Sequence, residues 1–220
     1  MKKSVMKHSE SIYRIQRYIN YFVWVTLIAA GIFSFLDDRW TVLFVTLLAF
    51  LLTFLPSLFE RRYRIDIPVE FEILVVIFVY ATLFLGEVGN FYLRFWWWDI
   101  LLHGISAVGF GIIGFMILFI LYKRGKVRAS PIWIAVFSFS FAIAIGAVWE
   151  IFEFGMDSFF GMSMQKSGLV DTMWDLIVDG AGALIASTIG FLYLEGEDRV
   201  SFAKLMKRFV RENPRLFRDR

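Results

Sequence analysis

Seven ionisable side chains in apolar parts of the sequence have the residue types and spacing of a metal or acid–base site. They come from three hydrophobic stretches: Asp99 and His103, Glu150 and Glu153, and Asp171, Asp175 and Asp179. Within each stretch the residues are three or four positions apart, which places their side chains on one face of an α-helix. Carboxylates and imidazoles bind divalent cations and also serve as general acids and bases.

These groups cannot face lipid singly, because an ionised side chain in hydrocarbon costs at least ~2.5–3.5 kcal/mol on insertion scales. They must therefore face one another, water or a cation. Six carboxylates and one imidazole do not neutralise one another, and only Arg39, Arg94 and Lys166 are expected on the same side of the membrane. Either several acids are protonated or a metal ion supplies the missing positive charge.

The residue types indicate which metal such a site would hold. The predicted metal ligands are Asp99, His103, Glu150 and Asp175. The predicted catalytic residues, each a candidate general base or a partner that orients a ligand, are Glu153, Asp171 and Asp179. A ligand set rich in oxygen with one imidazole favours Zn²⁺, Mn²⁺, Mg²⁺ or Fe²⁺ with an open position over a closed structural zinc site.

The elements that must position these residues are membrane-spanning helices. The 220-residue chain is 59% apolar, whereas soluble domains are typically ~45–50% apolar, and its mean hydropathy is +0.66. The absence of Cys excludes disulfides and thiol nucleophiles. The sequence predicts an all-α, polytopic integral membrane protein, because six stretches are long enough to cross a bilayer. They cover about 20–36, 40–59, 67–86, 99–122, 131–154 and 171–194.

The distribution of Lys and Arg predicts that both termini are cytoplasmic and that the protein lies in the cell membrane. With six spans, 20 of the 23 basic residues fall on one side, as the positive-inside rule requires. Residues 1–19 then form a cytoplasmic segment and 20–194 a six-span bundle. Residues 195–220 form a basic amphipathic tail, which we expect to bind anionic lipids of the inner leaflet and not nucleic acid.

The predicted topology brings the ionisable residues to one depth. The fourth and sixth spans run inward and the fifth runs outward, so all seven groups fall at the external end. Residues 98–107 also align without gaps on 174–183, which pairs Asp99 with Asp175 and His103 with Asp179. Small residues allow close approach of helix backbones. Those expected to pack the three spans together are Gly104, Ala107, Gly111, Gly146, Gly182, Ala186 and Gly190.

Three short motifs resemble a known family. The pair Asp99 and His103, the run WEIFE at 149–153 and the run DTMWDL at 171–176 resemble YjdF-like membrane proteins of bacteria and archaea. More distantly, the spacing of Asp, His and Gly is similar to that of VanZ-like proteins, which are associated with glycopeptide resistance at the cell envelope. The resemblance covers about residues 95–190 and implies six spans and the same site residues. The YjdF-like group has no settled activity, so the resemblance implies none.

Three functions remain open on sequence alone. The first is an enzyme that uses a bound metal to activate water against a lipid or lipid-linked ester of the envelope. The second is a transporter or proton-coupled exchanger that uses the carboxylates as a relay, with Glu70 and Glu72 supplying inner polarity. The third is a scaffold whose polar network only holds its helices together. The sequence contains no GxSxG, P-loop or HExxH motif.

Overall fold

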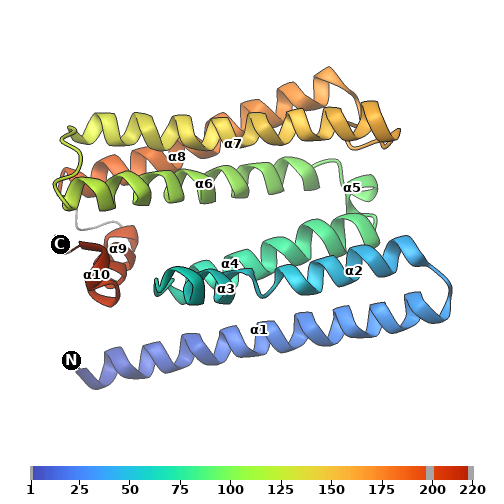
Figure 1. Cartoon of the computed structure of the whole chain (residues 1–220), viewed down its shortest axis with the longest axis horizontal. Helices are drawn as coiled ribbons and strands as arrows, with labels where there is room; N and C mark the ends of the chain where they lie inside the picture. The colour runs from blue at the N-terminus through green and yellow to red at the C-terminus, as the bar shows by residue number, and fades with distance from the viewer. Residues whose placement is uncertain (1, 197–200, 218–220) are drawn as a thin grey trace. The chain divides into compact units, whose positions relative to one another are not determined.

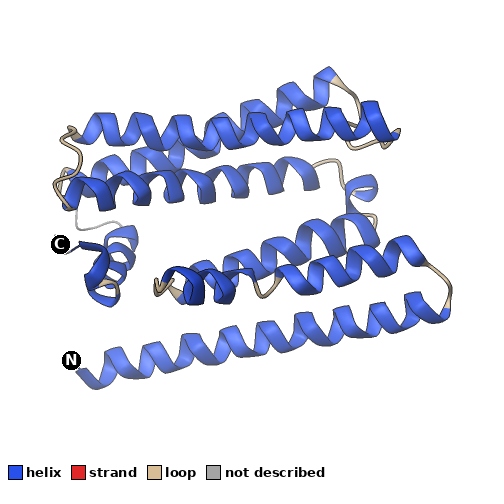
Figure 2. Ribbon diagram, in the orientation of Figure 1, coloured by secondary structure: helices blue, strands red, loops and turns tan. Residues whose placement is uncertain are grey.

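The computed structural model describes residues 2–196 and 201–217, with side chains from residue 11 onward apart from Ser201. Every regular element in this part of the chain is a helix (Figure 2). Six helical segments are long and apolar enough to cross a membrane, which confirms the predicted fold class. They are Ser11–Leu36, Trp40–Tyr63, Val69–Val88, Trp98–Lys123, Pro131–Phe160 and Leu169–Leu194.

The internal contacts of the chain divide it into two compact units, Met1–Phe95 and Trp96–Arg220, where the sequence predicted one segment over 20–194. The first unit contains α1 (Lys2–Leu36), α2 (Trp40–Leu52), α3 (Leu55–Tyr63), α4 (Val69–Val79), the π-helix η1 (Tyr80–Val88) and α5 (Phe91–Arg94). The second contains α6 (Trp98–Lys123), α7 (Pro131–Phe160), α8 (Leu169–Leu194), α9 (Ser201–Glu212) and α10 (Pro214–Phe217).

In the first unit, two of the predicted spans are not uniform α-helices. The second is broken between α2 and α3, with Pro56 in the first turn of α3, where the missing N–H of proline costs no helical hydrogen bond. Trp24 Nε1 donates to Thr53 Oγ1 at this break (3.0 Å). The third predicted span changes from the α-helix α4 to the π-helix η1 at Tyr80. The core of this unit is formed by Val23, Leu27, Ala49, Val76 and Val79.

In the second unit, α6, α7 and α8 each pack against the other two, with α7 running opposite to α6 and α8 (Figure 1). Small residues bring α6 and α8 together as predicted. A Cβ added at Gly182 would lie 2.8 Å from both Ala107 Cβ and the Gly104 carbonyl oxygen. One added at Gly111 would lie 2.5 Å from Ala186 Cβ. Larger side chains at these positions would force the two helices apart.

The predicted amphipathic helix of the tail is present as α9, but its apolar face contacts protein. Met206 and Phe209 are buried, and the ring of Phe202 packs against Phe115 and Tyr193, with centroids 5.7 and 5.9 Å away. Aromatic rings of α6 and α8 therefore cover part of this face. Binding of anionic lipid by the basic face of α9 stays a prediction.

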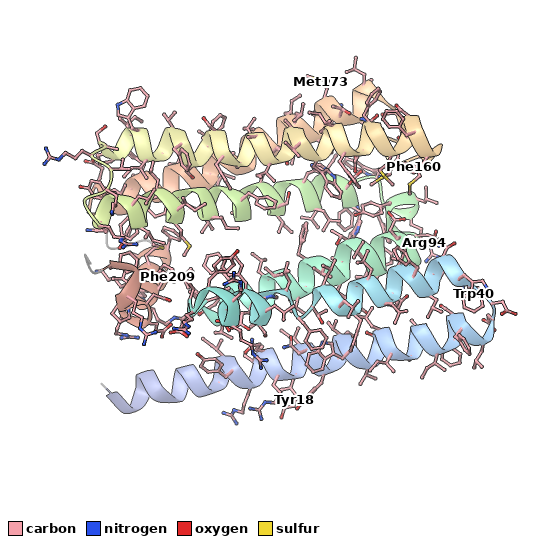
Figure 3. The ribbon with its side chains drawn as sticks, in the orientation of Figure 1. Tyr18, Trp40, Arg94, Phe160, Met173 and Phe209 are labelled. Carbon is pink, nitrogen blue, oxygen red and sulfur yellow. The ribbon has the colours of Figure 1, made fainter. Side chains whose placement is uncertain are left out.

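Parts of two sequence-based expectations lie outside the described residues. These parts are 197–200 and 218–220 of the predicted tail, and the side chains of Lys2, Lys3 and Lys7, which contributed to the orientation. Figure 3 labels Phe209 on α9 and Phe160 at the end of α7, which lie at opposite ends of the second unit. The end marked by Phe160, where α6 and α8 begin, carries the ionisable residues.

Candidate metal centre

The seven predicted side chains lie in the second unit, where α6 and α8 begin and α7 ends. We call these seven residues the acidic centre. His103 of α6, Glu150 of α7 and Asp175 of α8 are all buried, and each offers one ligand atom within 4.8 Å of the others. The expected convergence of three helices on one site is therefore found. These three residues form the inner group of the acidic centre.

His103 is held between carboxylates on both sides of its ring. Its Nδ1 lies 3.3 Å from Asp179 Oδ1, while its Nε2 lies 3.9 Å from Glu150 Oε1 and 4.0 Å from Asp99 Oδ1. Donation from Nδ1–H to Asp179 leaves the Nε2 lone pair directed toward Glu150 and Asp99. A carboxylate that fixes the tautomer of a ligating histidine is the usual partner of a metal-bound imidazole.

The buried carboxylate of Glu150 makes the inner group a candidate cation site. Glu150 is 4% exposed, and neither of its carboxylate oxygens has a hydrogen-bond partner among the described side chains and backbone. The Thr172 hydroxyl interacts with the Glu150 carboxylate, and the Thr172 oxygen itself accepts a hydrogen bond from Gln165 Nε2 at 2.6 Å. Asp179 Oδ2 is also buried without a partner. Buried polar atoms normally have a partner, and a divalent metal ion is one partner that carboxylates beside an imidazole can bind.

The spacing of the inner group suits such an ion. Two ligand atoms that each lie ~2.1 Å from one metal are at most ~4.2 Å apart. His103 Nε2 and Glu150 Oε1 are 3.9 Å apart, so one ion can contact both after a small side-chain movement. Divalent ions such as Zn²⁺, Mn²⁺ and Fe²⁺ accept a mixed set of imidazole and carboxylate ligands.

Asp99, Asp171 and Asp175 form a second set of ligand atoms within 4.8 Å of one another. We call it the outer group, because Asp99 and Asp171 are only partly buried. Lys166, from the loop between α7 and α8, places its Nζ 2.9 Å from Asp99 Oδ2. The backbone N–H of Lys166 also donates to Asp171 Oδ2 (3.0 Å). Asp175 belongs to both groups and is 3% exposed.

Glu153 lies outside both ligand groups, as Asp179 does. Glu153 is buried. Its Oε1 accepts a hydrogen bond from Trp149 Nε1 at 3.0 Å, and its electrostatic neighbours are Glu150, Asp99 and His103. Glu153 therefore lies beside the inner group with its orientation fixed by an indole. Its catalytic role stays a prediction, as do the roles of the other six.

Sequence reasoning missed how the loop between α7 and α8 is shaped. Asp157 accepts hydrogen bonds from the backbone N–H groups of Met164 (2.7 Å) and Gln165 (2.8 Å), which fixes the loop over the acidic centre. Gly161 ends α7 with a φ of 66°, a left-handed conformation that costs glycine little. The available signal was Asp157 itself, one helical turn beyond Glu153 and four residues before Gly161.

Comparison with known proteins adds a family but no activity. An uncharacterised protein from Thermotoga maritima is 27% identical over 136 residues, which cover 62% of this chain and 69% of the relative. No solved structure matches the chain. The VanZ-like resemblance stays a prediction. The model of a family described as "Predicted membrane protein (DUF2238)" matches residues 19–196, a range that includes the whole acidic centre. The chain is therefore a multi-pass membrane protein that belongs to the DUF2238 family.

Proposed function

We propose that the acidic centre binds a divalent cation through His103, Glu150 and Asp175, and that the site hydrolyses a lipid or lipid-linked ester. The observation that carries the proposal is the buried carboxylate of Glu150, whose two oxygens have no partner. If Asp99 is not a ligand of this ion, water or the substrate can take the open coordination position beside His103 Nε2. Asp99, predicted as a ligand of the same ion, lies 4.0 Å from His103 Nε2 and forms the outer group with Asp171 and Asp175.

The reaction class follows from the donor set and from the position of the site. A cation held by imidazole and carboxylates makes bound water nucleophilic near neutral pH and polarises an ester or phosphoryl oxygen. Glu153, held by Trp149 beside the inner group, is the side chain best placed to accept a proton from water. Asp179 has the separate task of keeping the His103 ring in its tautomer and orientation.

The substrate class follows from the position of the site in the membrane. His103 and Asp175 lie one to two turns inside the starts of α6 and α8, and Glu150 lies nearly three turns before the end of α7. A reacting bond must therefore reach headgroup depth or below. A lipid ester or the phosphate of a lipid-linked compound has its reactive atoms at that depth. With both termini cytoplasmic, the site opens to the outer leaflet of the cell membrane, and reporter fusions at either terminus would test that orientation.

The structure favours hydrolysis over transport by a carboxylate relay. A relay needs polar groups along the whole span, but the opposite half of α6–α8 is filled by Phe115 and Phe119, which are at most 1% exposed. The buried hydroxyls of Ser138 and Ser187 are bonded to the backbone carbonyls of Gly111 and Leu184. Glu72, which could have supplied inner polarity, accepts a hydrogen bond from Gln16 in the first unit.

A purely structural network is disfavoured by the same carboxylates that suggest a cation. A network that only fixes helix register gains stability when every buried member is hydrogen-bonded. Here three buried carboxylate oxygens, two on Glu150 and one on Asp179, have no partner. Leaving such atoms unsatisfied costs ~1–3 kcal/mol each, and more when they are charged.

Metal analysis of the purified protein tests the cation. We expect wild type to retain a divalent metal at one or more ions per chain, and His103→Ala and Asp175→Asn to lose it. The matched control is Glu195→Gln, which removes an exposed carboxylate at the other end of α8. Wild-type protein that binds no Zn²⁺, Mn²⁺, Mg²⁺ or Fe²⁺, either as purified or after dialysis against each ion, refutes the proposal.

Turnover is tested on lipids of the host membrane. Metal-loaded protein is mixed with micelles of total polar lipid extract, and released fatty acid and phosphate are followed by mass spectrometry. We expect product with wild type and Glu195→Gln, and none with Glu153→Gln, which keeps the metal but lacks the proton acceptor. If Glu153→Gln turns over at the wild-type rate, the assigned proton acceptor is wrong.

A further inference from the structure

We propose that the acidic centre binds two divalent cations, one in each ligand group, bridged by the carboxylate of Asp175. This inference rests on the proposed function, because it adds a second ion to the site where the first is proposed. It differs from the sequence prediction, in which four ligands surrounded a single ion. The outer group then has a role of its own.

The geometry that carries the proposal is the sharing of Asp175. Its carboxylate lies within 4.8 Å of His103 and Glu150 in the inner group and of Asp99 and Asp171 in the outer group. Metal ions in two-metal sites are typically ~3.5–4 Å apart, a distance that the two oxygens of one carboxylate can span. Asp175 is 3% exposed, so its carboxylate is shielded from solvent and is available to both groups.

The charge of the centre supports a second ion. Six carboxylates converge here, and the cationic side chain at the outer group is Lys166. With a neutral imidazole as ligand, one divalent ion and Lys166 together offset three of the six negative charges. A second divalent ion raises this to five. Burying the remaining unpaired carboxylates without it would cost several kcal/mol per charge, and an anionic lipid headgroup would be repelled.

Lys166 marks the place of the outer ion. Its ammonium lies 2.9 Å from Asp99 Oδ2, and its side chain is 32% exposed, so it can leave the group without moving a helix. The loop backbone stays in place when the ammonium leaves, because Asp157 holds the N–H groups of Met164 and Gln165. The displaced ammonium remains near the centre, where it can contact an anionic substrate.

The test is a titration of metal-free protein with Mn²⁺ in detergent, followed by equilibrium dialysis and by electron paramagnetic resonance. We expect two Mn²⁺ per wild-type chain at saturation, with the spectrum of a spin-coupled pair. Asp171→Asn should bind one ion and show an uncoupled spectrum. Glu195→Gln should behave as wild type. Helical circular dichroism shows that each variant is folded.

Failure of this inference and failure of the proposed function look different. Wild type that saturates at one uncoupled Mn²⁺ overturns the bridged pair but leaves the proposed cation site intact. Wild type that binds none overturns both.

Lys166→Met removes the competing ammonium and should tighten binding of the second ion by about 3- to 10-fold. Unchanged affinity for that ion would overturn the assigned exchange with Lys166.

Discussion

Gly146→Ala is a test of the acidic centre that leaves every ionisable residue in place. Gly146 lies on α7, one turn before Glu150, and faces Asp179 of α8. A Cβ added there would collide with Asp179 Oδ2 and would lie 2.9 Å from Asp179 Cγ and 3.4 Å from its Cβ. Carbon atoms pack at ~3.5–4.0 Å, so the carboxyl group must move by roughly 0.6–1.1 Å or the helices must separate.

Either response disturbs the proposed metal site. If the carboxyl group rotates, the 3.3 Å contact between Asp179 Oδ1 and His103 Nδ1, already near the limit of a hydrogen bond, is lost. If α7 and α8 separate, Glu150 moves away from Asp175. Loss of a partner that orients a metal ligand typically lowers metal affinity 10- to 100-fold. We therefore expect Gly146→Ala to weaken binding of the first cation by ~1.4–2.7 kcal/mol.

The assay is calorimetric titration of metal-free protein with Mn²⁺ in detergent. Gly155→Ala is the matched control, because it adds the same methyl group to α7 at a position with no atom within 4 Å. In an Asp179→Ala background, Gly146→Ala should have little further effect, since the two changes act through one side chain. Wild-type affinity in folded Gly146→Ala would refute the role assigned to Asp179.

Three further predictions concern packing and the loop. Gly182→Ala should destabilise the protein by ~1–3 kcal/mol in detergent unfolding, whereas Gly109→Ala, with open space around its Cβ, should not; equal stabilities would contradict the close approach of α6 and α8. Ser138→Ala should cost ~1 kcal/mol in the same assay by removing the hydrogen bond from α7 to the Gly111 carbonyl of α6, and more than Ser187→Ala, whose hydroxyl bonds within its own helix. Asp157→Ala should speed amide exchange at Met164 and Gln165 about 10-fold or more, and Asp157→Asn less; protection unchanged in Asp157→Ala would exclude Asp157 as the anchor of the loop.

The six spans and their meeting point were predictable from sequence because both follow from local patterns. Long apolar runs fix helices, and acids at helical spacing fix the face that must turn inward. Alternating direction then places Asp99, Glu150 and Asp175 at one end. The internal alignment added a pairing that the structure reproduces in space: Asp99 and Asp175 share the outer group, and His103 contacts Asp179.

The division of the acidic centre into two ligand groups was not predictable. It depends on side-chain rotamers and on sub-turn differences in helix height, which spacing along one helix does not encode. Lys166 was expected only as one of three counter-ions, and its contact with Asp99 depends on the fold of the loop. That fold is set by Asp157, an acid at the same helical spacing as the others, whose two oxygens accept backbone hydrogen bonds from Met164 and Gln165.

The tail shows a different limit of sequence reasoning. An amphipathic helix with a basic face has the same pattern whether its apolar face inserts into lipid or covers protein. The choice depends on whether apolar surface is available nearby, and rings on α6 and α8 provide it. A hydrophobic face of this kind therefore specifies that it will be buried, but not the partner that buries it.

The geometry of the acidic centre depends on the small residues that let the three helices pack closely. Asp has a short side chain, so Asp175 and Asp179 can share a site with groups on α6 and α7 only if the backbones come close. Gly146 supplies the space for Asp179, and Gly182, one turn beyond Asp179, lies against Gly104, the residue after His103. Close packing therefore begins at the same level as the ionisable groups. Gly146 and Gly182 therefore affect both the packing of the three helices and the separations between the ionisable side chains. Selection for the proposed metal site and selection for helix packing would act on the same positions.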